Sequence, residues 1–284
     1  DITSAVALNA ASFNSARLIG PAVSGLLLAT IEPAWVFIMN GCSYAAMIVA
    51  LLLLHKQELF SSIASTAKGS SVEVIHYLRR KPELILVLTI TLLIGAFSMN
   101  FPIFTSTMAV LFNKGASEFG VLSSEMAAGS LVAALWVAKK NHASITMIIL
   151  AALGVAASSL AMALSPSIEI YGLISVAMGF CVVTLITTAN GYLQTNTDPQ
   201  IRGRILALYL ALLVGSTPIG APLMGYVAQS FGPRQALVFS CITAFIAFTI
   251  GAIWWHKQQS LQKQSQGPSK PRLSISRDYS ELPT

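Results

Sequence analysis

Apolar residues fill long stretches of this chain, and short polar segments separate the stretches. Eight stretches are nearly free of charge and cover residues 5–29, 34–54, 84–111, 119–138, 145–164, 168–193, 205–228 and 236–255. A helix of about 20 residues, at 1.5 Å per residue, covers roughly 30 Å, which is the thickness of a bilayer's hydrocarbon core. The pattern therefore predicts an all-α membrane protein with eight transmembrane helices.

The first and seventh stretches repeat each other at a spacing of 200 residues without a gap. The positions that recur are Ala7, Leu8, Ile19, Gly20, Gly25 and Pro33, which correspond to Ala207, Leu208, Ile219, Gly220, Gly225 and Pro233. An internal repeat of this length indicates duplicated helix bundles.

Composition supports the membrane interpretation and argues against several other classes. Charged residues make up 10% of the chain, against about 25% in soluble domains. The net charge of +6 does not indicate a nucleic-acid-binding protein, because the basic residues form no single basic face or helix. The chain also lacks a phosphate-binding glycine loop, a zinc-protease motif and a serine-hydrolase motif, so we expect no cofactor, no metal and no enzymatic activity.

The basic residues alternate between loops and predict the orientation. Fourteen lysines and arginines fall in loops on one side of the predicted membrane or in the C-terminal tail, whereas the other side holds Lys114 and Arg234. Cytoplasmic loops are enriched in basic residues. We therefore predict a multi-pass protein of the cell membrane whose C-terminus is cytoplasmic. Trp136 is one of four tryptophans at predicted helix ends, where indole rings favour the headgroup layer.

Polar segments divide the chain into four parts. We predict a partial N-terminal bundle of two helices in 1–54, a cytoplasmic linker in 55–82, a six-helix bundle in 83–256 and a disordered tail in 257–284. The linker ends in an amphipathic stretch, 72–80, which is expected to lie as a helix on the cytoplasmic face.

Several segments resemble the major facilitator superfamily, and in particular its enterobactin-exporter and macrolide-efflux branch. They are 5–22, Arg79-Arg80-Lys81-Pro82-Glu83-Leu84, Asn100-Phe101-Pro102, 119–124 and Arg202-Gly203-Arg204. The resemblance implies a fold of twelve helices, of which this chain carries helices five to twelve. Helices one to four would be absent, and we expect a missing N-terminal segment of the same transporter as a partner.

Small residues around a proline in the first stretch resemble the family's antiporter motif. They are Ala16, Gly20, Pro21, Ser24 and Gly25. Physically, small residues let a neighbouring helix approach closely, and the proline removes a backbone hydrogen bond and bends the helix. Such a bend could act as a gate hinge, and tight packing alone is the alternative. A second copy at Ser216, Gly220, Pro222 and Gly225 favours packing.

Two charges lie deep in apolar stretches. Arg17 is about 18 Å from the predicted cytoplasmic face, and Glu125 is about 12 Å below the opposite surface, which places both at similar depths in a core of roughly 30 Å. Since an unpaired charge is costly there, we hypothesise that Arg17 and Glu125 pair in at least one transport state. Glu125 would then be a candidate proton carrier. The alternatives are a structural arginine and a glutamate at the mouth of the cavity.

Uncharged polar residues provide candidate substrate contacts. In the family, helices seven and ten line the cavity, so the resemblance implies that role for Asn100, Asn190 and Gln194. Interhelical hydrogen bonding is the alternative role for each.

These observations predict a secondary transporter that exports a small amphipathic molecule, drug-like or siderophore-like, by alternating access coupled to a proton or another ion. The expected partners are the lipid bilayer and the small-molecule substrate. The alternative is a truncated remnant, or a separately expressed half, that has no transport activity alone.

Overall fold

The computed structural model describes residue 27 and the ranges 30–53, 71–140 and 143–265. Within these residues the regular structure is entirely helical. The helices are α2 (Pro33–Leu52), α3 (Ser71–Arg80), α4 (Pro82–Phe97), α5 (Phe101–Leu111), α6 (Ala116–Ala138), α7 (Ile145–Ala163), α8 (Ile168–Asn196), α9 (Pro199–Gly215), α10 (Thr217–Ser230) and α11 (Pro233–Ser265).

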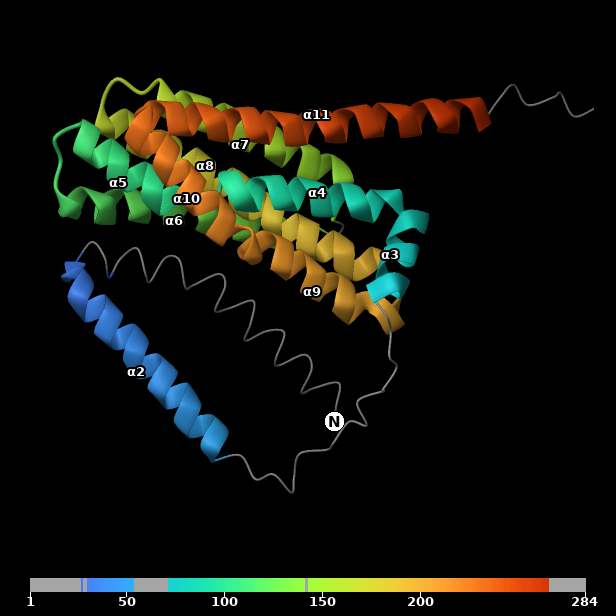
Figure 1. Ribbon diagram of the computed structural model, residues 1–284, viewed down its shortest axis with the longest axis horizontal. Coiled ribbons are helices and arrows are strands. Elements are labelled where there is room, and N and C mark those ends of the chain that lie inside the picture. The colour runs from blue at the N-terminus through green and yellow to red at the C-terminus, as the bar shows by residue number, and fades with distance from the viewer. Residues whose placement is uncertain (1–26, 28–29, 54–70, 141–142, 266–284) are drawn as a thin grey trace, which may run out of the picture.

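Seven segments of the described chain are long and apolar enough to cross a membrane. One is α2, and the other six follow α3, one for each apolar stretch predicted after residue 83. The stretch predicted at 5–29 lies outside the described residues except for its Leu27. The span Ala34–Leu52 within α2 has no buried residue, and α2 is drawn apart from the other helices in Figure 1.

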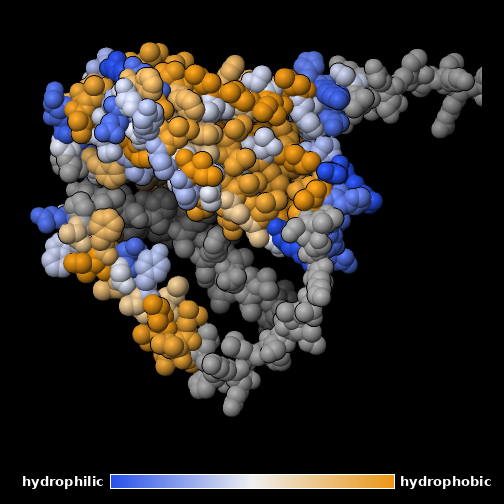
Figure 2. All heavy atoms as spheres, viewed as in Figure 1, coloured by the Kyte–Doolittle hydropathy of each residue, from blue (hydrophilic) through white to orange (hydrophobic). Residues whose placement is uncertain are grey.

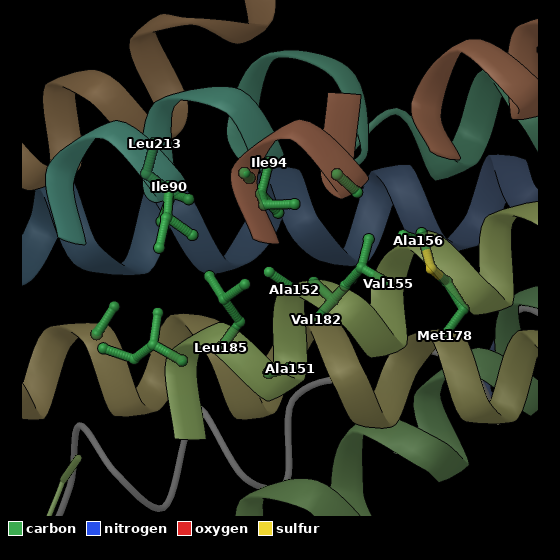
Figure 3. Packing of buried hydrophobic residues seen from close by; sticks show 14 of the residues in the cluster. Ile90, Ile94, Ala151, Ala152, Val155, Ala156, Met178, Val182, Leu185 and Leu213 are labelled. Atoms are coloured by element: carbon green, nitrogen blue, oxygen red, sulfur yellow. The ribbon is translucent and has the colours of Figure 1, made fainter. Parts of the chain in front are cut away.

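Helices α4 to α11 form one bundle whose core is built mainly from α4, α7, α8, α9 and α11. In the close view of Figure 3, Ile90 and Ile94 of α4 and Leu213 of α9 lie on one side of the core, with Val155 of α7 and Leu185 of α8 on the other. Apolar side chains also cover the outer flank of the bundle, and hydrophilic residues gather towards its ends (Figure 2). A bundle that is apolar both inside and on its flank is suited to a lipid environment.

Glycines bring α6 and α8 into close contact. A Cβ placed on Gly129 of α6 would lie 2.7 Å from the carbonyl carbon of Val176, and one on Gly179 of α8 would collide with the carbonyl oxygen of Met126. Small residues at such crossings allow the backbones of membrane helices to approach. The pairing of α6 with α8 is accordingly one of the most extensive in the bundle.

Two of the predicted helices are interrupted. The stretch predicted at 84–111 consists of α4 and α5 with a break at residues 98–100, and the stretch predicted at 205–228 consists of α9 and α10 with a turn at Ser216. A proline follows each break, Pro102 and Pro218, and its missing N–H cannot bond the carbonyl four residues earlier. These prolines are a physical reason for both interruptions.

The two breaks pack directly against each other. A Cβ on Gly95 of α4 would lie 2.6 Å from the carbonyl oxygen of Leu213 and 3.1 Å from the Ser216 hydroxyl oxygen. A Cβ on Gly220 of α10 would collide with the carbonyl oxygen of Ala96 and lie 2.6 Å from its carbonyl carbon. Gly220 belongs to the second copy of the small-residue motif, and in this copy it allows α10 to pack closely against α4. A Cβ on Gly225, by contrast, would meet no atom of the described residues within 4 Å.

Three buried serines join helices behind the first break. Ser240 of α11 donates to the Ser98 hydroxyl at 3.0 Å, and its oxygen lies 3.3 Å from that of Ser159 on α7. All three residues are fully buried. The hydroxyl groups therefore link α4, α7 and α11 by interhelical hydrogen bonds.

Successive spans run in opposite directions, so loops far apart in sequence meet at the same end. The end that holds α3, the start of α4 and the connection from α8 to α9 also carries the basic residues Arg79, Arg80, Lys81, Lys139, Lys140, Arg202, Arg204 and Lys257. We call it the basic end. α11 continues past the predicted helix end at residue 255 to Ser265, whereas the rest of the tail lies outside the described residues.

Candidate functional site

Asn190 and Gln194 lie one turn apart on α8, near the basic end. Gln194 is exposed and Asn190 is half-buried, and the Gln194 amide nitrogen donates a hydrogen bond to the Asn190 side-chain oxygen. The pair leaves amide donor and acceptor groups on the exposed side of α8. Of the three predicted substrate contacts, Asn190 and Gln194 are therefore the two whose amide groups are accessible.

Asn100 lies in a different environment. It is only 3% exposed, and its side-chain nitrogen donates to the Ala96 carbonyl oxygen at 2.7 Å. That carbonyl belongs to the last turn of α4. Because the helix breaks there, the carbonyl lacks the backbone N–H that would bond to it in a continuous helix. The described contacts of Asn100 therefore stabilise the interruption, and its contact with substrate stays a prediction.

Glu125 lies in α6, seven residues after the start of its membrane span at Glu118, or about 10 Å along the helix axis. Its carboxylate packs against Gly172 of α8, so closely that a Cβ on Gly172 would collide with Oε2. Oε2 is enclosed and has no hydrogen-bond partner among the described residues. A buried carboxylate oxygen without a partner is costly in an apolar surrounding, which favours a functional reason for its presence.

Further polar groups lie near the same part of α8. The hydroxyl groups of Thr105 on α5 and Tyr171 on α8 are enclosed and lie close enough to interact with each other. Tyr171 is the residue before Gly172, against which Glu125 packs. The surroundings of Glu125 on α8 are therefore not purely apolar.

The amphipathic helix predicted at 72–80 is confirmed as α3, and side chains attach it to the loop between α8 and α9. The Asp198 backbone N–H donates to the Tyr77 hydroxyl at 3.0 Å, and Lys81 donates to the Asn196 carbonyl oxygen at 2.9 Å. The Lys81 ammonium also lies 3.6 Å from the Asp198 carboxylate. Tyr77, and to a smaller extent the Asp198 charge, raise the pKa of Lys81, which keeps it protonated at neutral pH.

One ion pair extends this attachment to α9. An Arg204 guanidinium nitrogen lies 2.8 Å from Glu73 Oε2. Because both side chains are substantially exposed, the pair contributes little to stability and mainly fixes where α3 lies.

Other predicted site residues lie outside the described residues. They are Arg17 and the small-residue motif Ala16, Gly20, Pro21, Ser24 and Gly25. The proposed pairing of Arg17 with Glu125 and the gate hinge therefore stay predictions. Within the described residues, no group of three or more histidine, cysteine, aspartate or glutamate side chains could hold a metal ion.

Comparison with known proteins agrees with this arrangement. Residues 1–275 match the profile of the transmembrane secretion effector family. The chain belongs to this family of the major facilitator superfamily. The family match confirms the all-α membrane fold expected from the resemblance, and the family itself is one of membrane transporters.

One similar protein is the staphyloferrin A transporter of Staphylococcus aureus, which is 27% identical over 245 residues. The aligned region covers 81% of this chain and 58% of that transporter. The chain thus spans little more than half the length of the relative.

Sequence reasoning missed two features of this site. The attachment of α3 through Tyr77 and Asp198 joins residues 121 positions apart, and the local sequence around either residue does not predict it. The contact between Glu125 and Gly172 was also missed, although a glycine in a membrane helix is a signal for close packing.

Proposed function

We propose that this protein is a secondary transporter that exports a small amphipathic, siderophore-like molecule by alternating access, with Glu125 carrying the coupling proton. The family description, secretion effector, supports the outward direction. The relative's name gives staphyloferrin A as its cargo, which supports a substrate of the siderophore type.

The observation that carries the proposal is the enclosed Oε2 of Glu125. A carboxylate in a membrane span can bind a proton in one conformation and release it in another, provided that its surroundings change between the two. Gly172 forms one wall of the Glu125 environment, so a shift of α8 against α6 would change the solvent access of the carboxylate.

The substrate would contact the exposed side of α8 through Asn190 and Gln194. Amide groups both donate and accept hydrogen bonds, which suits a molecule rich in carboxylate and hydroxyl groups. An amphipathic molecule could also contact the apolar surface of the same helix.

The test of coupling uses everted membrane vesicles that carry the native gene product and a labelled siderophore. A pH gradient should drive uptake by the wild-type protein. Glu125→Gln should abolish gradient-driven accumulation while retaining equilibration of the substrate, because the amide cannot exchange a proton. Glu118→Gln, in the first turn of the same helix, is the matched control and should keep the gradient response.

The substrate contacts are tested in the same vesicles. Asn190→Ala and Gln194→Ala should raise KM, whereas Thr195→Ala should not, because the exposed Thr195 hydroxyl bonds to its own helix at Gly191. Normal gradient-driven accumulation by Glu125→Gln would refute the coupling role. An unchanged KM in both amide variants would refute the substrate role.

A further inference from the structure

A groove lies on the flank of the bundle where α6, α7 and α8 meet. Its upper part, near the basic end, has a volume of about 420 Å³ and is lined by Trp136 and Lys140 of the α6 end, Thr146 of α7 and Thr184 of α8. A second hollow of about 370 Å³ shares Phe180 and Cys181 with the first and continues between α6 and α8. Each volume lies in the range of small-molecule sites.

The upper part offers groups that bind an anion. The Lys140 ammonium lies 4.8 Å from the centroid of the Trp136 ring and is exposed. α7 begins beside it with Ser144 as its N-cap, so the first-turn N–H groups of α7 point towards this end of the groove. A lysine next to a helix N-terminus favours a phosphate or carboxylate group.

A buried hydroxyl group supplies an independent indication of a ligand. Thr184 is only 4% exposed and lines the groove, yet its Oγ1 has no hydrogen-bond partner among the described residues. A buried hydroxyl group without a partner costs free energy unless something else satisfies it. A polar group of a bound molecule, at the level of the ester groups below a phosphate, could accept its hydrogen bond.

The lower part is entirely apolar. Val132 of α6 and Leu173, Val176 and Ala177 of α8 form its walls. Gly129 packs against the Val176 backbone and closes the floor, because the two helices touch there. The groove is therefore a furrow that opens outward, where the membrane spans face hydrocarbon.

The length of the groove matches the thickness of the hydrocarbon layer in one leaflet of a bilayer. Lys140, just after the end of α6, is eleven positions beyond Gly129, and Thr184 is eleven positions beyond Leu173 on α8, which corresponds to about 16 Å of helix in each case. Half of a hydrocarbon core of roughly 30 Å is about 15 Å. The order of the lining groups, basic at the end of the span and apolar towards the middle, follows the polarity of a phospholipid.

We propose that this groove binds a phospholipid with an anionic headgroup. The phosphate lies between Lys140 and the start of α7, with Lys139 exposed beside it, and an acyl chain lies along the furrow between α6 and α8. Trp136 occupies the interfacial layer that indole rings favour. Selectivity for an anionic over a zwitterionic lipid comes from the two lysines, since the phosphate group itself is common to both.

The test is native mass spectrometry of the full chain in detergent, titrated with phosphatidylglycerol or phosphatidylcholine of the same acyl chains. The wild type should retain one phosphatidylglycerol molecule in preference to phosphatidylcholine. Lys140→Gln should weaken phosphatidylglycerol binding about fivefold, as expected for one lysine near an anionic headgroup. The matched control is Lys257→Gln, which removes an exposed lysine at the same end from a residue outside the groove.

A second pair of variants tests the acyl-chain furrow. Ala177→Phe fills the furrow from an exposed position and should reduce binding of both lipids, while Ala157→Phe adds the same side chain at an exposed position of α7 outside it. Equal retention of the two lipids by the wild type, or unchanged binding in both Lys140→Gln and Ala177→Phe, would overturn the proposal. Displacement of phosphatidylglycerol by millimolar inorganic phosphate would also overturn it, since the site would then select a soluble anion.

Discussion

Gly220 is a position at which a single added methyl group should disturb the packing of the bundle. A Cβ at residue 220 would lie 2.6 Å from the carbonyl carbon of Ala96, whereas ordinary contacts begin at 3.4 Å. α10 and α4 would have to separate locally by at least 0.8 Å, the difference between these two distances. The obstacle is the backbone of α4, so no side-chain rotation can relieve it.

The expected cost of Gly220→Ala is about 1 to 3 kcal/mol, the usual range for overpacking a well-packed core. Gly225→Ala is the matched control in the same helix, because a methyl group there has no atom within 4 Å among the described residues. Alanine is favoured over glycine inside a helix by roughly 0.5 to 1 kcal/mol, so the control should be neutral or slightly stabilising.

Thermal unfolding of the purified chain in detergent, followed by the loss of the monodisperse peak in gel filtration, measures the difference. Each kcal/mol corresponds to about 2 to 4 °C in a protein of this size. Gly220→Ala should therefore unfold below the wild type and Gly225→Ala at or above it. Equal unfolding temperatures for the two variants would show that the breaks do not pack as described.

Three further predictions concern charge, orientation and hydrogen bonding. Arg17→Glu and Glu125→Arg should each impair folding or transport, and the double exchange should recover part of the loss in a transport assay. A double variant that transports no better than the worse single variant would exclude the pair. In a cysteine-free background, Lys114→Cys should react with an impermeant thiol reagent on intact cells and Lys257→Cys should not, and the reverse labelling would invert the orientation. Ser240→Ala should lower stability by about 0.6 kcal/mol and by no more than about 1.7 kcal/mol, the average and the maximum for hydrogen bonds between membrane helices, and an unchanged unfolding temperature would argue against the serine network.

Hydropathy predicted the membrane spans well because the length of an apolar run is set by bilayer thickness. Every predicted stretch from residue 84 onward corresponds to a span, and the amphipathic pattern before Pro82 predicted α3. The interruptions at residues 98–100 and at Ser216 were not predicted, since the few polar residues there, among them Ser98, Asn100 and Ser216, are too short a run to end a long apolar stretch. Their cause is a missing backbone donor, to which a hydropathy average is insensitive.

The candidate site was predicted less completely. Glu125 could be singled out because a charge in an apolar run is conspicuous, and its enclosed oxygen agrees with a functional role. The polarity of Asn100 gave no indication that its amide would bond to Ala96. The groove beside Lys140 depends on how three helices diverge, which is a tertiary property that a single sequence does not encode in a local motif.

The contact between the two interrupted spans also limits how the sequence can vary. At most packed positions, a larger residue can be accommodated when a neighbouring side chain becomes smaller. Gly220 faces the main chain of Ala96, and Gly95 faces the main-chain oxygen of Leu213, so no substitution at those neighbours can create room. Second-site mutations that rescue a Gly220 variant should therefore arise only at positions that shift an entire helix. Gly95 and Gly220 should accordingly vary less among related sequences than the apolar residues around them.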